Sequence, residues 1–433
     1  MNKKTTDIFV VGFALFSIFF GAGNLLFPPY LGLVSGQDWF ISFLGFIIGD
    51  AGLALLVIVV AAKNKGILDE ILVRGGKKLA RFIGCAAILC IGPFLAIPRT
   101  AATTFEMSIL PFMPNLGTAG SVIFSIIFFV ATYFLTIKST KVLDIIGKFL
   151  TPVLLLSLLA LIIKGVITPI GPMSPDHMID RSLFSEGLSQ GYLTMDALGA
   201  SAMAGIMINT LVSKGYKDTK DQISMTIKSG FVAGIALSIV YGGLCYLGAT
   251  VSTFNDVNAV QTQVIVNITQ GLLGNVGKTV LAVAVALACL TTSIGLTSAT
   301  GQYFTNLTKG KISYGKIVLA VCVFSACMAS IGVGAIIKFA SPILSIVYPP
   351  TIVLIVLAFF NEKIENDNVY KFATYMSLII STLTVLQSYG VNVPFINSLP
   401  FAPLGFNWVV PVIVAGLIGN FVKSNKGSNK KTC

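Results

Sequence analysis

Long apolar runs separated by short polar segments occupy almost the whole chain of 433 residues. Twelve of these runs can form membrane-spanning helices, because a helix needs about 20 apolar residues to cross a bilayer. The predicted spans are residues 8–34, 39–62, 80–110, 119–137, 142–168, 188–213, 222–250, 274–307, 314–332, 334–360, 370–390 and 403–422. The pattern predicts an all-α membrane protein with 12 transmembrane helices.

The first span is interrupted near its middle by Gly21-Ala22-Gly23-Asn24. Glycine destabilises a helix by about 1 kcal/mol relative to alanine. A broken membrane helix leaves backbone groups unpaired, so it is tolerated only where it is buried in protein or lines a cavity. Discontinuous helices of this kind form the midplane sites of secondary transporters. The pattern therefore predicts a broken first span that contributes to a binding site.

The sixth span contains a second stretch of small residues, from Gly199 to Gly205. This span starts on the opposite side of the membrane from the first, five spans earlier in the chain. The two interruptions together predict a five-plus-five inverted repeat with broken helices 1 and 6. One transport domain would then comprise repeats of about residues 8–168 and 188–360 and two additional helices over 370–422. A small-residue packing face is the alternative interpretation of the second stretch.

Composition and charge placement support a membrane protein. The chain is 55% hydrophobic and 11% charged, whereas soluble proteins carry roughly 25% charged residues. The net charge of +12 would suggest nucleic acid in a soluble protein. If the N-terminus is cytoplasmic, however, 24 of the 29 basic residues fall in cytoplasmic segments. This bias predicts that both termini are cytoplasmic and that no nucleic acid is bound.

Sequence motifs for catalysis are absent. The chain has no Walker A, H-E-x-x-H or nucleophile-elbow motif, and its only histidine is His177. We therefore expect neither an enzyme nor a nucleotide-driven pump. Transport would be driven by an ion gradient or would be passive.

The predicted helix breaks supply backbone groups for a substrate. Free N–H groups and the helix dipole at the start of a half-helix attract an anion, so a substrate carboxylate is expected against Ala22, Gly23 and Asn24. Free carbonyl groups bind a cation or an ammonium group. A second set of such carbonyls is expected in the sixth span at Gly199, Ala200 and Ser201.

Four charged residues lie at or near membrane depth: Asp50, Arg99, Glu106 and Asp196. Ionisable residues in this position are costly and often functional. Asp196 could bind a substrate ammonium group or pair with Arg99. Asp50 could be a proton or cation group, or a polar anchor near a helix end.

The eighth span contains Thr291-Thr292-Ser293, three adjacent hydroxyl residues. Hydroxyl and carbonyl oxygens are ligands that a hard cation prefers. Hydrogen bonds from each hydroxyl to the preceding helical turn are the alternative.

Three motifs resemble those of the bacterial branched-chain amino acid:cation symporters (BrnQ type). They are Phe20-Gly21-Ala22-Gly23-Asn24 with Phe27-Pro28-Pro29, Gly92-Pro93-Phe94 with Ile97-Pro98-Arg99-Thr100, and Gly191-Tyr192-Leu193-Thr194-Met195-Asp196-Ala197-Leu198-Gly199. The resemblance covers nearly the whole chain. It implies uptake of leucine, isoleucine and valine, coupled to sodium or to protons.

More distantly, the chain is similar to the LeuT-like sodium-coupled transporters, which also have a Gly-x-Gly-Asn break in their first span. Their Ala-x-x-Thr-Ser arrangement in the eighth span is matched by Ala288, Thr291 and Thr292. This resemblance implies a sodium site formed by the two threonine hydroxyls and the carbonyls of Ala288, Ser17 and Phe20. Thr292 stands where those relatives have serine, which keeps the oxygen. One sodium site is predicted, and a second stays open.

The combined expectation is a secondary active importer of branched-chain amino acids in the bacterial cytoplasmic membrane, surrounded by lipid. It would work by sodium symport with alternating access. A proton-coupled carrier that uses Asp50, Glu106 or Asp196 is the first alternative. A passive channel and a membrane sensor without net flux are the others.

Overall fold

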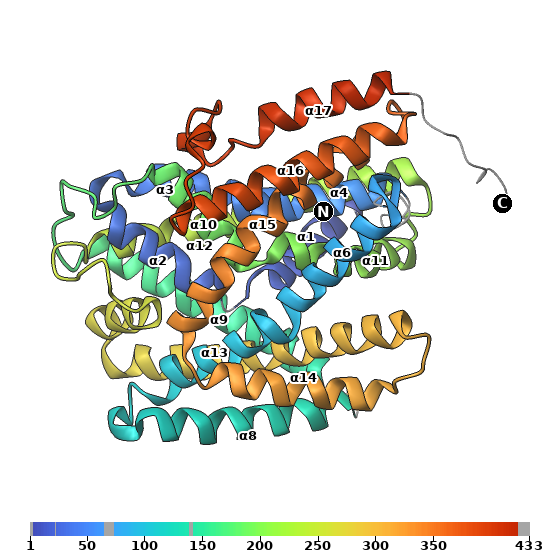
Figure 1. Cartoon of the computed structure of the whole chain (residues 1–433). Coiled ribbons are helices and arrows are strands. Elements are labelled where there is room, and N and C mark those ends of the chain that lie inside the picture. Colours follow the sequence, from blue (N-terminus) through green and yellow to red (C-terminus); the bar gives the residue numbers. More distant parts are fainter. Residues whose placement is uncertain (1–2, 22, 65–72, 138–141, 423–433) are drawn as a thin grey trace. The chain divides into compact units, whose positions relative to one another are not determined.

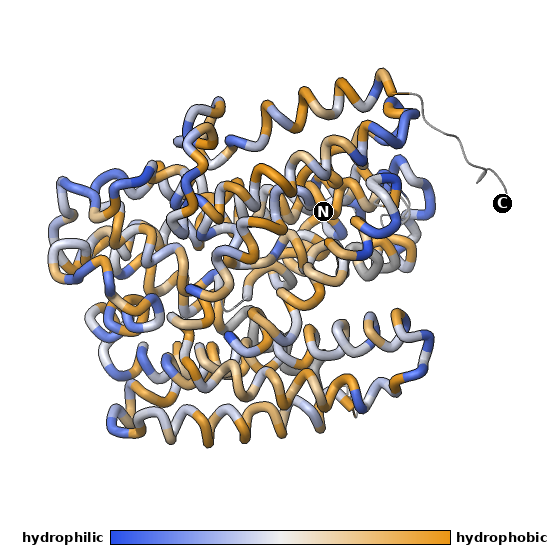
Figure 2. The backbone as a smooth tube through the Cα atoms, viewed as in Figure 1, coloured by the Kyte–Doolittle hydropathy of each residue, from blue (hydrophilic) through white to orange (hydrophobic). Residues whose placement is uncertain are grey.

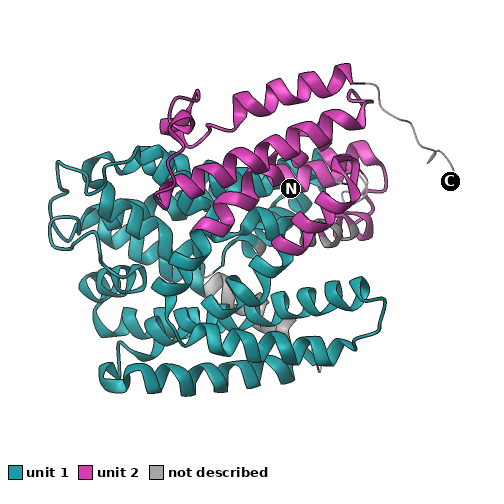
Figure 3. Cartoon of the chain, in the orientation of Figure 1, with its two compact units in different colours: residues 1–55, 88–202, 224–341 teal, residues 56–87, 203–223, 342–433 magenta. Residues whose placement is uncertain are grey.

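The computed structural model describes residues 3–21, 23–64, 73–137 and 142–422, and of residues 18, 142–153, 201–206 and 209 it describes the backbone alone. Every regular element in these ranges is a helix, which confirms the all-α class (Figure 1). The chain forms two compact units (Figure 3). Unit 1 comprises residues 1–55, 88–202 and 224–341, and unit 2 comprises residues 56–87, 203–223 and 342–433.

Unit 1 contains most of the described helices. Its α-helices are α1 (Lys3–Phe19), α2 (Gly23–Ser35), α3 (Trp39–Ile47), α7 (Ala96–Thr104), α8 (Gly117–Ile137), α9 (Val142–Ile167), α10 (Leu183–Thr194), α13 (Gln261–Leu307) and α14 (Tyr314–Ala329). Its π-helical segments are η2 (Ile48–Gly52), η4 (Cys90–Phe94) and η5 (Phe105–Ile109). Its short 3₁₀ turns are η1 (Gly36–Asp38) and η6 (Pro114–Leu116).

Five helices run from one unit into the other. They are α4 (Leu53–Lys63), α6 (Lys77–Leu89), α11 (Asp196–Ser213), α12 (Thr219–Ala249) and α15 (Val333–Phe359). Unit 2 adds α16 (Asp367–Ser388), α17 (Val409–Phe421), η3 (Val73–Gly75), η7 (Pro394–Ile396) and η8 (Ala402–Leu404).

Seven helical segments within the described ranges are long and apolar enough to cross a membrane, by length and composition. They are Gly23–Lys63, Lys77–Ile109, Pro114–Ile137, Thr219–Ala249, Gln261–Leu307, Val333–Phe359 and Asp367–Ser388. Three shorter apolar helices are Leu154–Ile167, Tyr314–Ala329 and Val409–Phe421. Hydrophilic residues gather in the connecting segments (Figure 2). The count of twelve spans and the inverted repeat stay predictions.

The helix α13 starts earlier than the predicted eighth span. It begins at Gln261, so part of the segment before residue 274 is helical. The helix changes direction at Gly274, whose φ of 63° and ψ of −157° are not helical. Only glycine adopts such a conformation readily. The predicted start of the span therefore coincides with a kink inside a longer helix.

Close glycine contacts hold the helices of unit 1 together around α10. Gly45 and Gly49 form a Gly-x-x-x-Gly pattern at α3 and η2, and Gly187 and Gly191 form another on α10. A Cβ atom at Gly187 would lie 1.9 Å from the Ser42 carbonyl oxygen. Such patterns let membrane helices approach backbone to backbone. The same device joins α2 to α12, where a Cβ at residue 32 would lie 1.7 Å from a carbonyl oxygen of α12.

Arg74, which precedes α6, connects two segments of unit 2. Its Nε lies 2.6 Å from Asp367 Oδ1 and its Nη2 lies 2.6 Å from the Ile364 carbonyl oxygen. The guanidinium also lies 4.3 Å from the centroid of the Tyr370 ring. These contacts join η3 to the start of α16.

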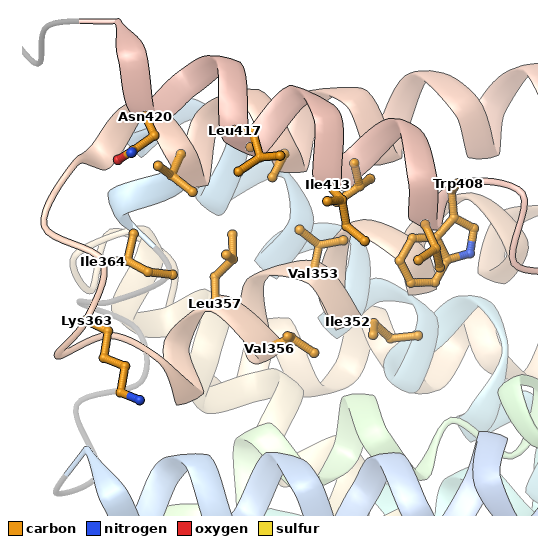
Figure 4. Close-up of a pocket in the computed structure, with 15 residues that line it drawn as sticks. Ile352, Val353, Val356, Leu357, Lys363, Ile364, Trp408, Ile413, Leu417 and Asn420 are labelled. Carbon is orange, nitrogen blue, oxygen red and sulfur yellow. The ribbon is translucent and has the colours of Figure 1, made fainter.

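A cavity of about 580 Å³ lies between α15, α16 and α17 in unit 2 (Figure 4). Its lining is almost entirely apolar, with Ile352, Ile413 and Leu417 among the side chains, and Lys363 and Asn420 at one end. None of the predicted site residues lines it.

Substituting Gly187 by alanine should destabilise the protein, because the added methyl group collides with the α3 backbone. Overpacking of this kind typically costs about 1–3 kcal/mol. Thermal unfolding of the purified protein in detergent measures the loss. The matched control is Gly295→Ala in α13, where a Cβ meets nothing within 4 Å. Equal melting temperatures for the two variants would contradict the proposed backbone contact.

Candidate functional site

The amide of Asn24 lies at the centre of a buried polar cluster in unit 1. The helix α1 ends at Phe19, and α2 starts four residues later. Oxygens from four elements surround Asn24 Nδ2: the Phe19 carbonyl at 3.0 Å, Asp196 Oδ2 at 2.8 Å, Asp50 Oδ2 at 3.3 Å and the Tyr241 hydroxyl. An amide nitrogen carries two hydrogens, so Asn24 Nδ2 cannot donate to all four oxygens at once. The remaining contacts need hydrogens from other groups, and the hydroxyls of Thr194 and Tyr241, which lie within reach of Asp50, each carry one.

Asp50 enters this cluster from the π-helical segment η2 and is fully buried. π-Helical turns inside α-helices are frequent at functional sites. One carboxyl oxygen lies 2.7 Å from the Thr194 hydroxyl, and the carboxyl also lies within hydrogen-bonding reach of Asp196. A buried carboxyl in contact with a second, half-buried one cannot be charged at the same time as its neighbour without a compensating cation.

Arg99 supplies the positive charge of the site. It lies on α7, is 5% exposed, and donates hydrogen bonds to the carbonyls of Leu193 and Thr194. These carbonyls end α10, where the helix dipole favours a cation. The guanidinium also lies beside the start of α2, because a Cβ at Gly23 would be 2.8 Å from Arg99 Nη2. Its charge acts on Asp196 as well.

The predicted interruption at Gly199–Gly205 is wrong. The helix α11 runs without a break from Asp196 to Ser213. The helix end lies earlier, at Met195, whose φ of 68° is left-handed. This conformation is uncommon for a residue with a side chain. It persists here because Arg99 binds the two carbonyls that the end of α10 leaves free.

Because the helix end lies at Met195, the carbonyls expected as ligands have a different position in the structure. Gly199 and Ala200 lie inside the first turns of α11, and the Gly199 N–H donates to the Met195 carbonyl. Only the backbone of Ser201 is described, and it is helical. The carbonyls of these three residues are therefore not at a helix break. Ala22 lies outside the described residues.

The predicted sodium ligands lie on α1 and α13. The Thr291 hydroxyl donates to the Ala288 carbonyl at 2.9 Å, which is the back-bonding that the sequence left open. Ser17 is exposed, and its hydroxyl donates to the Phe13 carbonyl at 2.9 Å. Its own carbonyl lies at the frayed end of α1. There the Gly21 N–H donates to the Phe19 carbonyl, whereas in a continued α-helix it would donate to the Ser17 carbonyl.

The other two predicted sodium ligands are the Phe20 carbonyl and the Thr292 hydroxyl. Phe20 stacks on Phe16 and on Tyr241, with ring centroids 5.2 Å and 6.2 Å apart. Thr292 is half-buried on α13. The sodium site stays a prediction.

The hydrogen-bond partners of Glu106 lie outside the Asn24 cluster. Its Oε2 accepts from the Thr262 hydroxyl at 2.6 Å, and its Oε1 accepts from the Val333 N–H at 2.8 Å. It therefore caps the N-terminus of α15 and connects η5 to α13, which is a structural role.

Three members of the cluster, Asp50, Thr194 and Tyr241, are absent from the predicted site. Thr194 lies within one of the quoted motifs, so its proximity to Asp196 was available from the sequence. Tyr241 carries no such signal, because it is one of 12 tyrosines and lies in an unremarkable apolar span. Asp50 stood out as an intramembrane acid, without an assigned role.

Sequence comparison identifies relatives over nearly the full chain. A family model described as "Branched-chain amino acid transport protein" matches residues 4–426. Putative branched-chain amino acid carrier proteins of Staphylococcus aureus strains USA300 and MRSA252 are each 35% identical over 448 residues. Each alignment covers 98% of this chain and 98% of the relative.

Structure comparison identifies the fold. MhsT in complex with L-phenylalanine has a TM-score of 0.58 at 16% identity, over 95% of this chain and 98% of that one. Inward-facing Mhp1 has a TM-score of 0.61 at 13% identity, over 95% and 90%. A Na⁺-coupled sialic acid symporter has a TM-score of 0.52 at 15% identity, over 97% and 98%. These similarities show a LeuT-like fold.

Replacing Arg99 with leucine should destabilise the protein strongly, since the buried carbonyls of Leu193 and Thr194 lose their donors. Each unsatisfied buried group costs about 1–3 kcal/mol. Thermal unfolding in detergent measures the effect. The matched control is Arg181→Leu, which removes a half-exposed ion pair with Glu186, and such pairs contribute about 0–1 kcal/mol. Similar losses in both variants would refute the assignment.

Proposed function

Because the chain belongs to the family of branched-chain amino acid transport proteins, we propose that it imports leucine, isoleucine and valine across the bacterial cytoplasmic membrane. Family and fold identify a multi-pass membrane transporter rather than an enzyme. We place both termini in the cytoplasm, on the basis of the lysine and arginine distribution.

The single observation that carries the substrate proposal is the pair of opposite charges beside the start of α2. Arg99 lies against Gly23 at the N-terminus of this helix, and Asp196 lies 2.8 Å from the Asn24 amide. An α-amino acid carries a carboxylate and an ammonium group on one carbon. The guanidinium and the helix N-terminus would bind the carboxylate, and Asp196 would bind the ammonium group.

Aromatic side chains supply apolar surface close to these charges. Phe27 lies under Arg99, at 5.5 Å from the guanidinium to the ring centroid, and the rings of Phe20 and Phe46 contact Tyr241. An apolar pocket separates ligands that differ by one methylene by only about 1–3 kcal/mol. One carrier for leucine, isoleucine and valine is therefore the expected specificity.

Transport would follow alternating access, with α1 and α2 as the halves of a broken first span and α10 and α11 as the halves of a broken sixth span. The coupling ion in this proposal is sodium, bound by the carbonyls of Ser17, Phe20 and Ala288 and the hydroxyls of Thr291 and Thr292. Proton coupling is the second candidate, favoured by the contact between the buried Asp50 and the half-buried Asp196.

Radiolabelled leucine should accumulate in proteoliposomes under an inward sodium gradient and not without a gradient. Unlabelled isoleucine and valine should compete. Thr292→Val removes one hydroxyl ligand, so we expect it to weaken sodium activation while the melting temperature is kept. Accumulation with a proton gradient alone would reject sodium and favour the second candidate. If no gradient drives accumulation, the symporter proposal fails.

Gly23→Leu should abolish saturable leucine binding, because the new side chain would fill the space between α2 and Arg99. A Cβ there lies 3.1 Å from Arg99 Cζ and 3.2 Å from Phe27 Cε2. Equilibrium binding of radiolabelled leucine to the purified protein measures the loss. Gly295→Leu is the control, since that position is exposed and open. Normal binding by Gly23→Leu would place the substrate elsewhere.

A further inference from the structure

Asp50 is a buried ionisable residue that the proposed substrate contacts do not use. Its exposed fraction is 0%, and it lies on η2, within hydrogen-bonding reach of the proposed ligand Asp196. It contacts Thr194, Asn24 and Asp196, and the Tyr241 hydroxyl is also within hydrogen-bonding reach. A carboxylate placed here would be costly unless a partner compensated its charge.

The hydrogen bonds of the Thr194 hydroxyl indicate the protonation state of the Asp50 carboxyl. The hydroxyl oxygen of Thr194 lies 2.6 Å from the Gly191 carbonyl oxygen and 2.7 Å from Asp50 Oδ1. A carbonyl can only accept, and a threonine hydroxyl has one hydrogen. If that hydrogen goes to Gly191, the contact with Asp50 needs a hydrogen from the carboxyl itself. A protonated Asp50 satisfies both short contacts.

The charge balance of the cluster leads to the same state. Arg99 is the cation whose charge acts on Asp196, and an arginine stays protonated in proteins. Among the protein's own groups, one arginine and one aspartate balance each other, and a zwitterionic substrate adds no net charge. A second ionised carboxyl in contact with Asp196 would leave an unbalanced negative charge in a low-dielectric interior.

Other ionisable groups around the pair do not provide this balance. The helix α12 contributes Tyr241, and α10 carries Tyr192 and Glu186; none of the three is basic. Glu186 forms an ion pair with Arg181 at 2.7 Å. Within the described residues, Arg99 is therefore the basic group that lies at the end of α10 and acts on Asp196.

We propose that Asp50 carries a proton when substrate binds, and that this proton leaves Asp196 as the single carboxylate that receives the substrate ammonium group. Asp50 is then a positioning residue that acts through Asp196. This inference rests on the proposed function, and it makes amino acid binding depend on a proton whichever ion drives transport. Loss of the proton would place a second negative charge in the cluster and disrupt the site.

Leucine affinity of the full-length protein in detergent, measured between pH 5.5 and pH 9, tests this inference. Binding that requires one proton weakens by about tenfold per pH unit above the pH at which the proton dissociates. Asp50→Asn mimics the protonated acid, so it should bind leucine with an affinity that no longer changes with pH. Asp196→Asn should lose binding at every pH. Binding retained by Asp196→Asn and lost by Asp50→Asn would overturn the assignment.

The matched control is Glu106→Gln, which neutralises another carboxyl at membrane depth that is hydrogen-bonded elsewhere. It should keep the pH dependence of the unmodified protein. A pH dependence in Asp50→Asn equal to that of the unmodified protein would also overturn the proposal.

Infrared spectroscopy without leucine separates this inference from the transport proposal. The unmodified protein should show a protonated-carboxyl stretch that is missing in Asp50→Asn and present in Glu106→Gln. The band can be read even if leucine is not the substrate, in which case the binding assay alone would fail. If the band persists in Asp50→Asn, the proton lies elsewhere and the inference is wrong.

Discussion

Backbone groups at helix ends inside a membrane must find partners, and the arrangement of this site follows from that constraint. The carbonyl of Phe19 at the end of α1 accepts a hydrogen bond from the Asn24 side chain. The carbonyls of Leu193 and Thr194 at the end of α10 accept from Arg99. Charged and polar side chains thus lie at the helix ends, where the proposed substrate would bind. The groups that complete the backbone hydrogen bonding are the groups that can recognise an amino acid.

Close glycine packing decides how near those helix ends come to one another. Without side chains at Gly45 and Gly187, α3 and α10 approach until their backbones touch, and this brings η2 against the end of α10. Asp50 and Thr194 consequently lie 2.7 Å apart although they are 144 residues apart in the chain. A larger residue at either glycine would push the two helices apart and separate Asp50 from Thr194. Packing and chemistry in this protein therefore depend on the same small residues.

Local chain chemistry explains where sequence-based prediction succeeded and where it failed. The helical class and the charge-bearing motif residues Asn24, Arg99 and Asp196 are evident from apolar periodicity and from the cost of burying polar groups. The end of α10 was misplaced, because small residues at Gly199–Gly205 resemble a break while Met195 has no preference for the left-handed conformation that it adopts. A neighbouring helix supplies Arg99, which stabilises that end. Local propensity contains no information about such a partner.

The sequence by itself determined the membrane environment, the helical class and the transporter family, since these depend on composition, on the spacing of apolar runs and on contiguous motifs. Tertiary structure alone decided which polar residues meet. Tyr241 and Asp50 reach Asn24 from separate helices, and Glu106, an equally conspicuous acid, becomes a cap for α15 instead. The physical reason is that burial makes an ionisable side chain costly wherever it lies, whereas only the packing of distant helices determines which donor or charge compensates that cost.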